Sequence, residues 1–448
     1  MSNGTFDDNR SLWWATANAR SAEPWAASPA LAEDLDCDVA IVGGGFTGVS
    51  TAYHLARRFP DKRVVLLEAR HLGNGASGRN GGLVLNWVNG VDTRDLAMAR
   101  RIYDTTRAGI DAIEARIREH GLDVPFRRDG CLDVLTDWRR AEAAALEVER
   151  LQSAGIPVRF VAGKELAALG RFEGATGAIF DPTAGQIDGL ALVRAMRPVL
   201  EELGVHVHEE TPVTRIEEGE TITLTTPNAR VRAKAIVLGT NAYTPRLGYF
   251  AHGIVPLHSH LVSTEALAPE VWEEIGWSRH LAGFSDDLDR VAYGGMTTRG
   301  ELVFGGGSND AYAYGFASGT AYRGDATQAF DAIERTLHRY LPRLGKRGVR
   351  IAHRWTGPVA LTMSRVCTMG VQGAHKNVYF ALGYSGHGIT LANLAGEVLT
   401  DVYAGDDAKW RGLPFYQQRL LWVPPEPFRW VGYHAYTRVT GRSPRRQL

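Results

Sequence analysis

A glycine-rich loop follows an apolar, strand-like run near the start of the chain. The run Asp38–Val42 leads into Gly43–Gly48, which reads Gly-Gly-Gly-Phe-Thr-Gly and is followed by a helix-like segment to about Arg58. In a G-x-G-x-x-G loop the first glycine permits a tight turn, the second admits a pyrophosphate to backbone N–H groups, and the third lets helix and strand pack closely. A second apolar run, Val64–Leu67, ends on Glu68, whose carboxylate can accept a ribose hydroxyl. These features predict a dinucleotide site.

Two further glycine-rich segments indicate which dinucleotide binds. Gly75–Gly82 reads GASGRNGG and provides a second cradle, which FAD needs and NAD does not. Glycine and serine would also suit a flexible surface loop, although such a loop gains nothing from Arg79. Near the other end of the chain, the apolar run Val378–Leu382 leads into Gly383–Gly388 and a helix to about Tyr403. The N-terminus of that helix favours an anionic edge such as that of a reduced flavin, so we predict FAD.

Together these loops resemble those of the D-amino-acid-oxidase superfamily of flavoproteins. Gly75–Gly82 and Gly383–Gly388 are most similar to the γ-glutamylputrescine oxidase-like branch, and the segments Ser11–Trp14 and Pro424–Arg429 also fit that branch. The resemblance covers nearly the whole chain; its FAD motifs are specific, whereas its substrate pocket is not. It implies FAD-dependent oxidation of an amine or amino acid by hydride transfer to flavin N5, giving an imine that hydrolyses.

The residues expected to bind FAD lie in these loops and in the turns that the fold brings beside them. They are Gly43, Gly45, Phe46, Thr47, Gly48, Glu68, Ala69, Arg70, Ala76, Ser77, Gly78, Arg79, Asn80, Gly81, Gly82, Leu83, Val213, Gly239, Thr240, Asn241, Gly357, Gly383, Tyr384, Gly386, His387, Gly388, Ile389 and Thr390. Val213 is included because the resemblance implies that backbone groups there meet the adenine.

Fewer residues are candidates for the chemistry itself. Tyr384 and His387 are the candidates for catalytic contacts, and His260, Arg354 and Trp355 for the substrate pocket. Each also has a purely structural interpretation: Tyr384 could simply pack, His260 could be a satisfied structural histidine, and Arg354 could form a surface ion pair. Flavin chemistry needs few side-chain acids or bases, because positioning and a dry pocket supply much of the effect.

Two departures from the family pattern bear on the substrate. Sarcosine oxidases carry a carboxylate-binding lysine where this chain has Thr390, and glycine oxidases carry an arginine before the proline that corresponds to Pro358. Since a buried carboxylate without a cationic partner is costly, glycine and sarcosine are disfavoured. An amine with no nearby carboxylate, or with a distal anionic group held elsewhere, fits better.

The expected mode of FAD binding is non-covalent. Relatives that link FAD through cysteine carry it close to Trp355, whereas Cys367 lies about a dozen residues further on. Relatives that link it through histidine place that residue in the second glycine-rich loop, where this chain has Arg79.

Composition limits the possible partners. Lys+Arg and Asp+Glu are both 50, so the net charge of zero gives no general attraction to nucleic acid or an anionic membrane. The Arg438–Arg446 segment is a local exception, interpreted as a solvated tail. There is no apolar run of membrane-spanning length and no signal-peptide pattern, and three widely spaced cysteines suit a reducing compartment, so a cytoplasmic protein is expected. Motifs for hydrolytic, metal or phosphoryl-transfer chemistry are absent, and the oligomeric state is left open.

The patterning predicts an α/β fold with two interleaved domains. A Rossmann-type FAD-binding domain alternates with an α+β substrate domain built on a mainly antiparallel sheet. The expected segments are residues 1–35 (N-terminal arm), 36–90, 186–246 and 351–405 (FAD-binding), 91–185 and 247–350 (substrate domain), and 406–448 (C-terminal tail).

The electron acceptor and the existence of catalysis have open alternatives. Oxygen is the expected acceptor, although no lysine stands in the strand Leu302–Gly306 to match the oxygen-activating lysine of sarcosine oxidases. A dehydrogenase passing electrons to another carrier is the alternative. A different class, a flavin-binding subunit without its own catalysis, would dock through the tryptophan-rich tail containing Trp410, Trp422 and Trp430.

Overall fold

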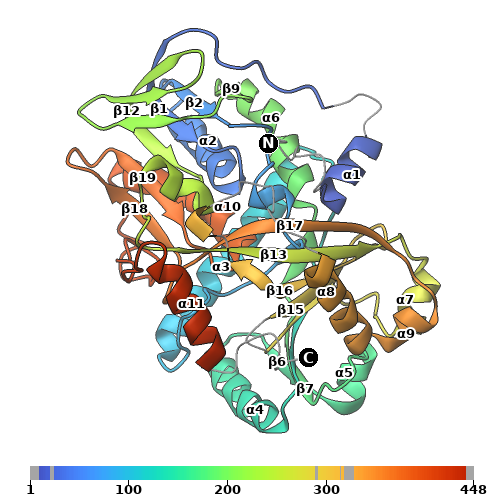
Figure 1. Ribbon diagram of the computed structural model, residues 1–448. Coiled ribbons are helices and arrows are strands. Elements are labelled where there is room, and N and C mark those ends of the chain that lie inside the picture. Colours follow the sequence, from blue (N-terminus) through green and yellow to red (C-terminus); the bar gives the residue numbers. More distant parts are fainter. Residues whose placement is uncertain (1–9, 21–24, 288–290, 313, 317–326, 440–448) are drawn as a thin grey trace.

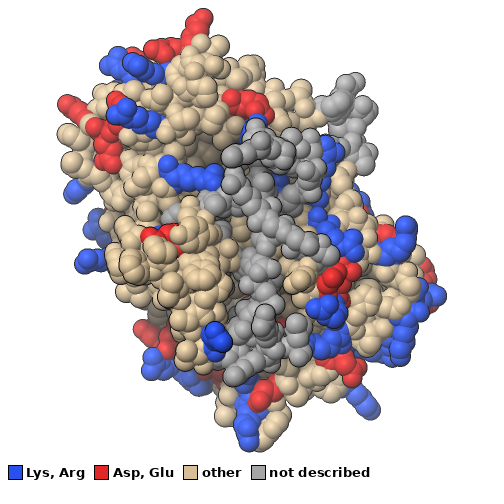
Figure 2. All heavy atoms as spheres, in the orientation of Figure 1, with Lys and Arg blue, Asp and Glu red and all other residues tan. Residues whose placement is uncertain are grey.

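The computed structural model describes residues 10–20, 25–287, 291–312, 314–316 and 327–439. Two large sheets with helices between and around them form the body of the protein, which Figure 1 shows with the first sheet above the second. Basic and acidic side chains are interspersed over the face drawn in Figure 2, as the zero net charge leads one to expect.

The first sheet is mainly parallel. Its strands are β1 (Leu35–Val42), β2 (Val64–Leu67), β9 (His206–His208), β10 (Arg215–Glu217), β11 (Ile222–Thr225), β12 (Arg230–Leu238), β18 (Thr368–Gln372) and β19 (Val378–Leu382). The order is β10-β11-β12-β1-β2-β9, and β19 also pairs with β12 and carries β18. β1 is parallel to both β2 and β12, as in the Rossmann arrangement. Strands β2 and β19 are buried along their whole length, which explains their continuous apolar runs.

Helices cover this sheet and bring distant segments together. They are α2 (Phe46–Arg58), α3 (Leu96–Glu119), α6 (Gly189–Glu202) and α10 (Gly388–Ala404), and their apolar faces share one core with β1 and β2. α2 and α10 approach so closely that a Cβ atom on Gly396 would lie 2.3 Å from the Ser50 hydroxyl oxygen. This contact places the middle of α10 against the first half of α2.

The second sheet is mainly antiparallel, in the order β17-β13-β16-β15-β14-β5-β7-β6. Its strands are β5 (Cys131–Leu135), β6 (Arg159–Val161), β7 (Gly177–Asp181), β13 (Val255–Thr264), β14 (Gly283–Asp286), β15 (Ala292–Met296), β16 (Leu302–Tyr312) and β17 (Ile351–Leu361). Beside it lie α4 (Trp138–Ser153), α5 (Gly163–Leu169), α7 (Pro269–Ile275), α8 (Thr327–Tyr340) and α9 (Pro342–Lys346). The fold class predicted from the sequence is confirmed.

One boundary differs from the sequence division. The strand β17 was assigned to the third FAD-binding segment, residues 351–405, but it pairs with β13 in the second sheet along its length, from Val255 opposite Leu361 to Thr264 opposite Ile351. The chain returns to the first sheet only at β18. The backbone ladder with β13, which no local sequence pattern reports, decides where this strand belongs.

Short elements complete the fold. A small sheet β3-β8-β4 is formed by β3 (Leu83–Val84), β8 (Gly185–Ile187) and β4 (Phe126–Arg127). The 3₁₀ helices of the described residues are η2 (Ala76–Gly78), η3 (Asn241–Leu247) and η4 (Tyr314–Phe316). The two ends of the described chain carry helices α1 (Leu12–Arg20) and α11 (Phe428–Val439).

Candidate cofactor and active site

The first glycine-rich loop has no room for side chains at two of its glycines. Gly43 has φ +105°, and a Cβ atom there would lie 2.9 Å from the carbonyl oxygen of Gly239. A Cβ atom on Gly48 would lie 1.9 Å from the carbonyl oxygen of Gly43. The tight turn and the close helix packing expected of these positions are therefore present, and α2 begins at Phe46 with its N-terminus at the loop.

Glu68 stands beside this loop at the end of β2. Its two carboxylate oxygens accept hydrogen bonds from the backbone N–H groups of Gly44, at 2.7 Å, and Arg70, at 2.9 Å. Burial raises the pKa of Glu68 to about 6, against the lowering effect of these bonds. A carboxylate has about four acceptor positions, so these two bonds orient Glu68 and leave capacity for a ribose hydroxyl.

The second glycine-rich loop is anchored on several sides. The hydroxyl oxygen of Ser77 accepts a hydrogen bond from the backbone N–H of Phe46 at 2.9 Å, which joins this loop to the first turn of α2. The Trp355 indole N–H donates to the carbonyl oxygen of Arg79 at 3.0 Å. Residues Asn74, Ser77 and Arg79 are buried. A flexible surface loop, the alternative interpretation of Gly75–Gly82, is wrong.

Helix α1 contributes a further anchor that the sequence did not indicate. The Trp13 indole N–H donates to the carbonyl oxygen of Asn80 at 2.7 Å, and the Ser11 hydroxyl donates to that of Gly78 at 2.6 Å. Trp13 is 1% exposed and packs with Trp355 in one apolar cluster. The N-terminal arm thus binds two carbonyl groups of the predicted cofactor loop, those of Gly78 and Asn80.

Arg79 and Tyr243 are buried polar side chains at the second glycine-rich loop: Arg79 belongs to it, and the Tyr243 ring lies beside Gly75. The Arg79 guanidinium is buried and donates to the carbonyl oxygens of Asn74, at 3.1 Å, and Thr356, at 3.5 Å; burial lowers its pKa. The Tyr243 hydroxyl oxygen is buried with no hydrogen-bond partner among the described residues, and burial raises its pKa to about 12. An unsatisfied buried hydroxyl beside a glycine cradle fits a bound dinucleotide, which would supply the missing partner.

The third loop joins the C-terminal part of the chain to α2. The hydroxyl groups of Tyr384 and Thr47 are 2.7 Å apart, and the backbone N–H of Gly383 donates to the Asn241 side-chain oxygen at 3.0 Å. Gly383 and Gly386 have positive φ angles, which their lack of a Cβ atom permits, and Ser385 between them also adopts one. The structure therefore brings together the three segments that the sequence singled out.

The side chains of His387 and Thr390 differ in what they can offer a ligand. The Nδ1 atom of His387 is buried without a hydrogen-bond partner among the described residues, and burial lowers the pKa of this histidine to about 4. It is therefore neutral near pH 7. The Thr390 hydroxyl instead donates to the carbonyl oxygen of Leu85 at 2.7 Å. Burial raises the pKa of Tyr384 far above its usual range, so its hydroxyl stays protonated.

The three substrate-pocket candidates do not lie together. Trp355 is on the face of the second sheet that packs on α1 and Arg79. The ring of His260 lies against Phe330 of α8 on the other face, with ring centroids 5.5 Å apart, and burial lowers its pKa to about 4. Arg354 is 46% exposed and pairs with Glu334 at 2.6 Å. Of the three, only Trp355 contacts the predicted cofactor loop, and Arg354 forms the surface ion pair considered above.

Other predicted cofactor residues make hydrogen bonds, an ion pair or packing contacts within the protein. The backbone N–H of Gly239 donates to Val42 O at 2.9 Å, and the Thr240 hydroxyl lies 2.8 Å from that of Thr244. Asn80 donates within its own loop, to Ser77 O at 2.7 Å. Arg70 is exposed and pairs with Glu210 at 3.6 Å, and Val213 is half-buried against the core of the first sheet.

Several contact residues carried no signal in the sequence. Tyr293 of β15 would meet a Cβ atom on Gly81 at 2.6 Å, and its hydroxyl lies 2.8 Å from that of Ser259 on β13. The Asn89 amide donates to the carbonyl oxygen of Ser385 at 2.9 Å. Together with Tyr243, these side chains join loops that lie far apart in the chain. Their spacing follows no motif, so only the folded arrangement identifies them.

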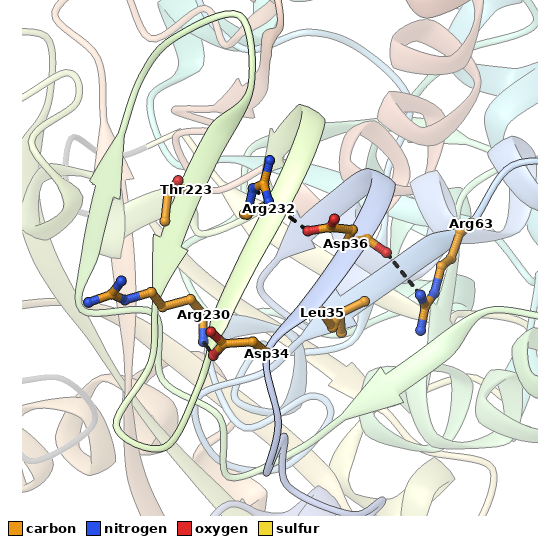
Figure 3. A pocket seen from close by; sticks show the side chains of 7 residues that line it. All are labelled: Asp34, Leu35, Asp36, Arg63, Thr223, Arg230 and Arg232. Carbon is orange, nitrogen blue, oxygen red and sulfur yellow. Dashed lines mark hydrogen bonds and ion pairs between the residues drawn. The ribbon is translucent and has the colours of Figure 1, made fainter.

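A surface pocket of about 500 Å³ lies away from these loops. Its lining consists of Asp34, Leu35, Asp36, Arg63, Thr223, Arg230 and Arg232 (Figure 3). Arg232 pairs with the Asp36 carboxylate at 3.7 Å, and Arg63 donates to the Asp36 carbonyl oxygen at 3.0 Å. Because β1 begins at this pocket and ends at the first glycine-rich loop, the pocket is at the wrong end of the strand for the cofactor.

Comparison with known proteins agrees with this geometry. The family described as FAD dependent oxidoreductase matches residues 38–402, which is most of the chain. The chain belongs to this family. FAD is therefore its cofactor, and the glycine cradle, the acceptor Glu68 and the unsatisfied Tyr243 hydroxyl fit that group.

Individual relatives of this FAD-dependent oxidoreductase are similar over most of their length. Gamma-glutamylputrescine oxidoreductase of Escherichia coli (strain K12) is 30% identical, covering 91% of this chain and 94% of the relative. A probable oxidoreductase of Haemophilus influenzae is 26% identical, covering 85% and 86%. Among solved structures, glycine oxidase from Geobacillus kaustophilus has a TM-score of 0.72 at 21% identity, covering 86% of this chain and 99% of that one. The last comparison bears on the fold alone.

None of the described helices has the length and apolar character needed to cross a membrane. In the same part of the chain, His, Cys, Asp and Glu side chains do not gather in threes in a way that could hold a metal ion.

Proposed function

We propose that this protein oxidises an amine with an extended chain, using non-covalently bound FAD and releasing an imine that hydrolyses to a carbonyl compound and an amine or ammonia. FAD supplies the hydride acceptor when bound. The single observation that carries the proposal is the convergence of the three glycine-rich segments, joined by the Tyr384–Thr47 and Ser77–Phe46 hydrogen bonds. We infer that the flavin lies where these segments meet, at the N-terminus of α10.

The residues of the chain act by positioning and electrostatics. Helix α10 begins at Gly388. The partial positive charge at its N-terminus is directed at the proposed flavin position, where it would stabilise the negative charge that develops during reduction. His387 is neutral near pH 7 and offers Nδ1 to a bound group. The protonated Tyr384 hydroxyl is held by Thr47 and cannot serve as a base. We therefore expect the substrate amine to be bound in its neutral form and no side chain to remove its proton in the rate-limiting step.

The choice of substrate rests on which cations are free to bind a carboxylate. The position matching the lysine of sarcosine oxidases is Thr390, whose hydroxyl is committed to Leu85. Pro358 follows Gly357 rather than an arginine, and Arg354 is paired with Glu334. The similarity to gamma-glutamylputrescine oxidoreductase supports an amine whose reacting carbon is distant from any carboxylate.

Non-covalent attachment is supported by the surroundings of the cysteines. Cys367 is buried, and burial raises the pKa of its thiol to about 12, so it has little thiolate to react with a flavin. Arg79 occupies the loop position where relatives carry a linking histidine. Denaturation by acid should release all the yellow colour as intact FAD, and flavin remaining on the precipitated polypeptide would contradict this part of the proposal.

The central test is anaerobic reduction of the bound flavin by a panel of amines. Bleaching by at least one amine marks an enzyme, whereas indifference to the whole panel would favour a flavin-binding subunit. We propose oxygen as the acceptor. Reoxidation in air with one hydrogen peroxide formed per amine oxidised supports an oxidase; slow reoxidation by oxygen but fast reoxidation by an artificial quinone supports the dehydrogenase alternative.

A further inference from the structure

Gln186 is a buried polar side chain beside the end of the second glycine-rich loop. It is 1% exposed, and its amide nitrogen Nε2 has no hydrogen-bond partner among the described residues. A Cβ atom on Gly82, the last residue of that loop, would lie 2.7 Å from this nitrogen. A buried amide donor without an acceptor is costly, so such a group in a native protein has a ligand as its partner or a function of its own.

The position of Gln186 is fixed by its surroundings. It lies in β8, the central strand of the small sheet, opposite Leu83 of β3 and Arg127 of β4. The stem of the side chain is confined as well, because a Cβ atom on Gly295 of β15 would lie 3.1 Å from Gln186 Cγ. The stem therefore meets β15, and the amide meets the end of the glycine-rich loop.

The two ends of this loop lie in different surroundings. At its beginning, a Cβ atom on Gly75 would lie 3.5 Å from the ring of Tyr243, whose pKa is raised by burial and, to a smaller extent, by the charge of Glu68. This is the nucleotide end, since Glu68 is the candidate for the adenosine ribose. Near its other end, Gly81 lies against Tyr293 of the second sheet. A dinucleotide that runs along the loop therefore has its flavin near the second sheet.

The flavin offers the acceptor that the Gln186 amide lacks. FAD is the cofactor of the family, and the pyrimidine ring of its flavin carries two carbonyl oxygens. These oxygens gain negative charge when the flavin is reduced. A hydrogen bond to an anionic acceptor is stronger than one to a neutral acceptor, so a donor at this position stabilises the reduced flavin more than the oxidised flavin.

The ribityl hydroxyl groups of FAD are the alternative acceptors. They carry the same charge in the oxidised and the reduced cofactor, so a hydrogen bond to one of them would leave the reduction potential unchanged. The potential therefore separates the two kinds of contact.

We propose that Gln186 is a cofactor-binding residue whose side-chain amide donates a hydrogen bond to a carbonyl oxygen of the flavin pyrimidine ring. This contact fixes the ring at the Gly82 end of the second loop and raises its reduction potential. The proposal rests on the flavin position given under the proposed function. It adds a residue that neither the glycine motifs nor their spacing predicted.

The reduction potential of the bound FAD tests the proposal. Gln186→Met keeps the length of the side chain and removes both of its polar atoms. Relative to oxidised FAD, this variant should bind reduced FAD at least about tenfold more weakly than the wild type does, which for a two-electron couple lowers the potential by about 30 mV. Stepwise reduction with dithionite against a reference dye measures the potential without any amine, so the result does not depend on the substrate.

Gln186→Glu is a second variant that keeps the shape of the side chain. Its carboxylate, once ionised, repels the charge of the reduced flavin, so the potential should fall below the wild-type value and fall further as the pH rises.

Asn377→Ala is the matched control. Asn377 is also a buried amide, and it donates to the carbonyl oxygen of Gly219 at 3.0 Å. It precedes β19, whose other end leads into the third glycine-rich loop, so this amide is at the end of the strand away from the cofactor. The control should lose stability but keep the wild-type potential.

An unchanged potential in Gln186→Met would overturn the proposal, and a loss of stability or FAD affinity alone would assign the amide a structural role. Infrared spectra of the wild-type holoprotein give a check that needs no variant: both carbonyl bands of oxidised FAD at their positions in aprotic solvent would also refute the contact.

The variant His387→Gln distinguishes a failure of this proposal from a misplaced flavin. His387 is the N-cap of α10, so its substitution should change the potential if the flavin lies at that helix. Wild-type potentials in both His387→Gln and Gln186→Met would mean that the flavin position is wrong. A change in His387→Gln alone would leave that position standing and refute the contact with Gln186.

Discussion

The Tyr384 hydroxyl lies 2.7 Å from the Thr47 hydroxyl, although 337 residues separate them in the chain. Thr47 is in the first turn of α2, and Tyr384 is in the loop before α10. This bond joins the first turn of α2 to the loop before α10, so it connects the N-termini of the two helices. Since both hydroxyls are buried, loss of one leaves the other without its partner.

Tyr384→Phe should therefore lower the free energy of unfolding of the FAD-loaded protein by about 1–3 kcal/mol, the cost of an unsatisfied buried hydroxyl. The rate of flavin reduction should fall less than about tenfold, because the tyrosine is not a base. Denaturant unfolding and stopped-flow reduction measure the two quantities. Thr47→Val and the double variant complete a cycle, and a rate loss far beyond tenfold in Tyr384→Phe alone would assign this residue a catalytic role.

The N-terminal arm should affect FAD retention through the second glycine-rich loop. Trp13→Phe removes the hydrogen bond to Asn80 O and should weaken FAD binding by about 0.5–1.5 kcal/mol, with a similar effect for Ser11→Ala. Trp25→Phe is the matched control: Trp25 is on the same arm, but its indole N–H donates to the Glu209 carboxylate and not to a carbonyl group of the loop. Equal loss of FAD affinity in all three variants would show a general stability effect rather than a loop-specific one.

Glu68 should contribute to FAD affinity through its free acceptor positions. Glu68→Ala removes a charged acceptor and should weaken FAD binding by about 1.5–3 kcal/mol. Titration of the apoprotein with FAD, followed by flavin fluorescence, gives the dissociation constant. Glu68→Gln keeps one acceptor oxygen and should fall between the two. Wild-type affinity in the alanine variant would mean that the ribose is bound elsewhere.

The neutral state of His387 predicts part of the acid sensitivity. Its pKa is lowered from 6.5 to about 4 by burial, so between these values the unfolded chain binds a proton that the folded protein does not. The contribution to stability is complete above pH 6.5 and is lost as the pH falls toward 4. In His387→Gln the free energy of unfolding should fall less steeply over this range than in the wild type. Parallel pH profiles for the two proteins would contradict the assignment.

Local sequence patterns predicted the elements that surround the cofactor well. The strands Val64–Leu67 and Val378–Leu382 have the bounds expected from their apolar runs, and the glycine loop spacing anticipated the clash at Gly48. These features depend on neighbours within a few residues, because buried parallel strands and tight turns restrict composition locally. The cofactor side of the site could therefore be predicted from the sequence.

Local sequence patterns did not predict which strands pair or toward which face of the sheet a side chain points. His260 and Trp355 are both buried on paired strands, yet they point to opposite faces, and only one of them reaches the cofactor loop. Period-two alternation shows which residues share a face but not which element covers that face. The Trp13–Asn80 bond likewise joins residues 67 positions apart with no local signal.

The substrate prediction follows from the two missing carboxylate clamps. With Thr390 bonded to Leu85 O and Arg354 paired with Glu334, neither supplies a cation beside the reacting carbon. Amines with extended chains, γ-glutamylputrescine among them, should therefore reduce the flavin faster than glycine, sarcosine or D-alanine. The difference should be at least about 1.5 kcal/mol, or more than about tenfold in kcat/KM.

Anaerobic stopped-flow reduction with chain-matched pairs measures this difference directly. Each pair consists of an amine and the amino acid that carries a carboxylate on the same reacting carbon, so that the two differ by that carboxylate. A fixed preference for the amine across pairs of increasing length locates the effect at the reacting carbon, whereas a preference that grows with length reflects burial of the chain. If glycine or sarcosine reduces the flavin as fast as the best long amine, Arg79 or another cation binds the carboxylate, and the inference from the missing clamps is wrong.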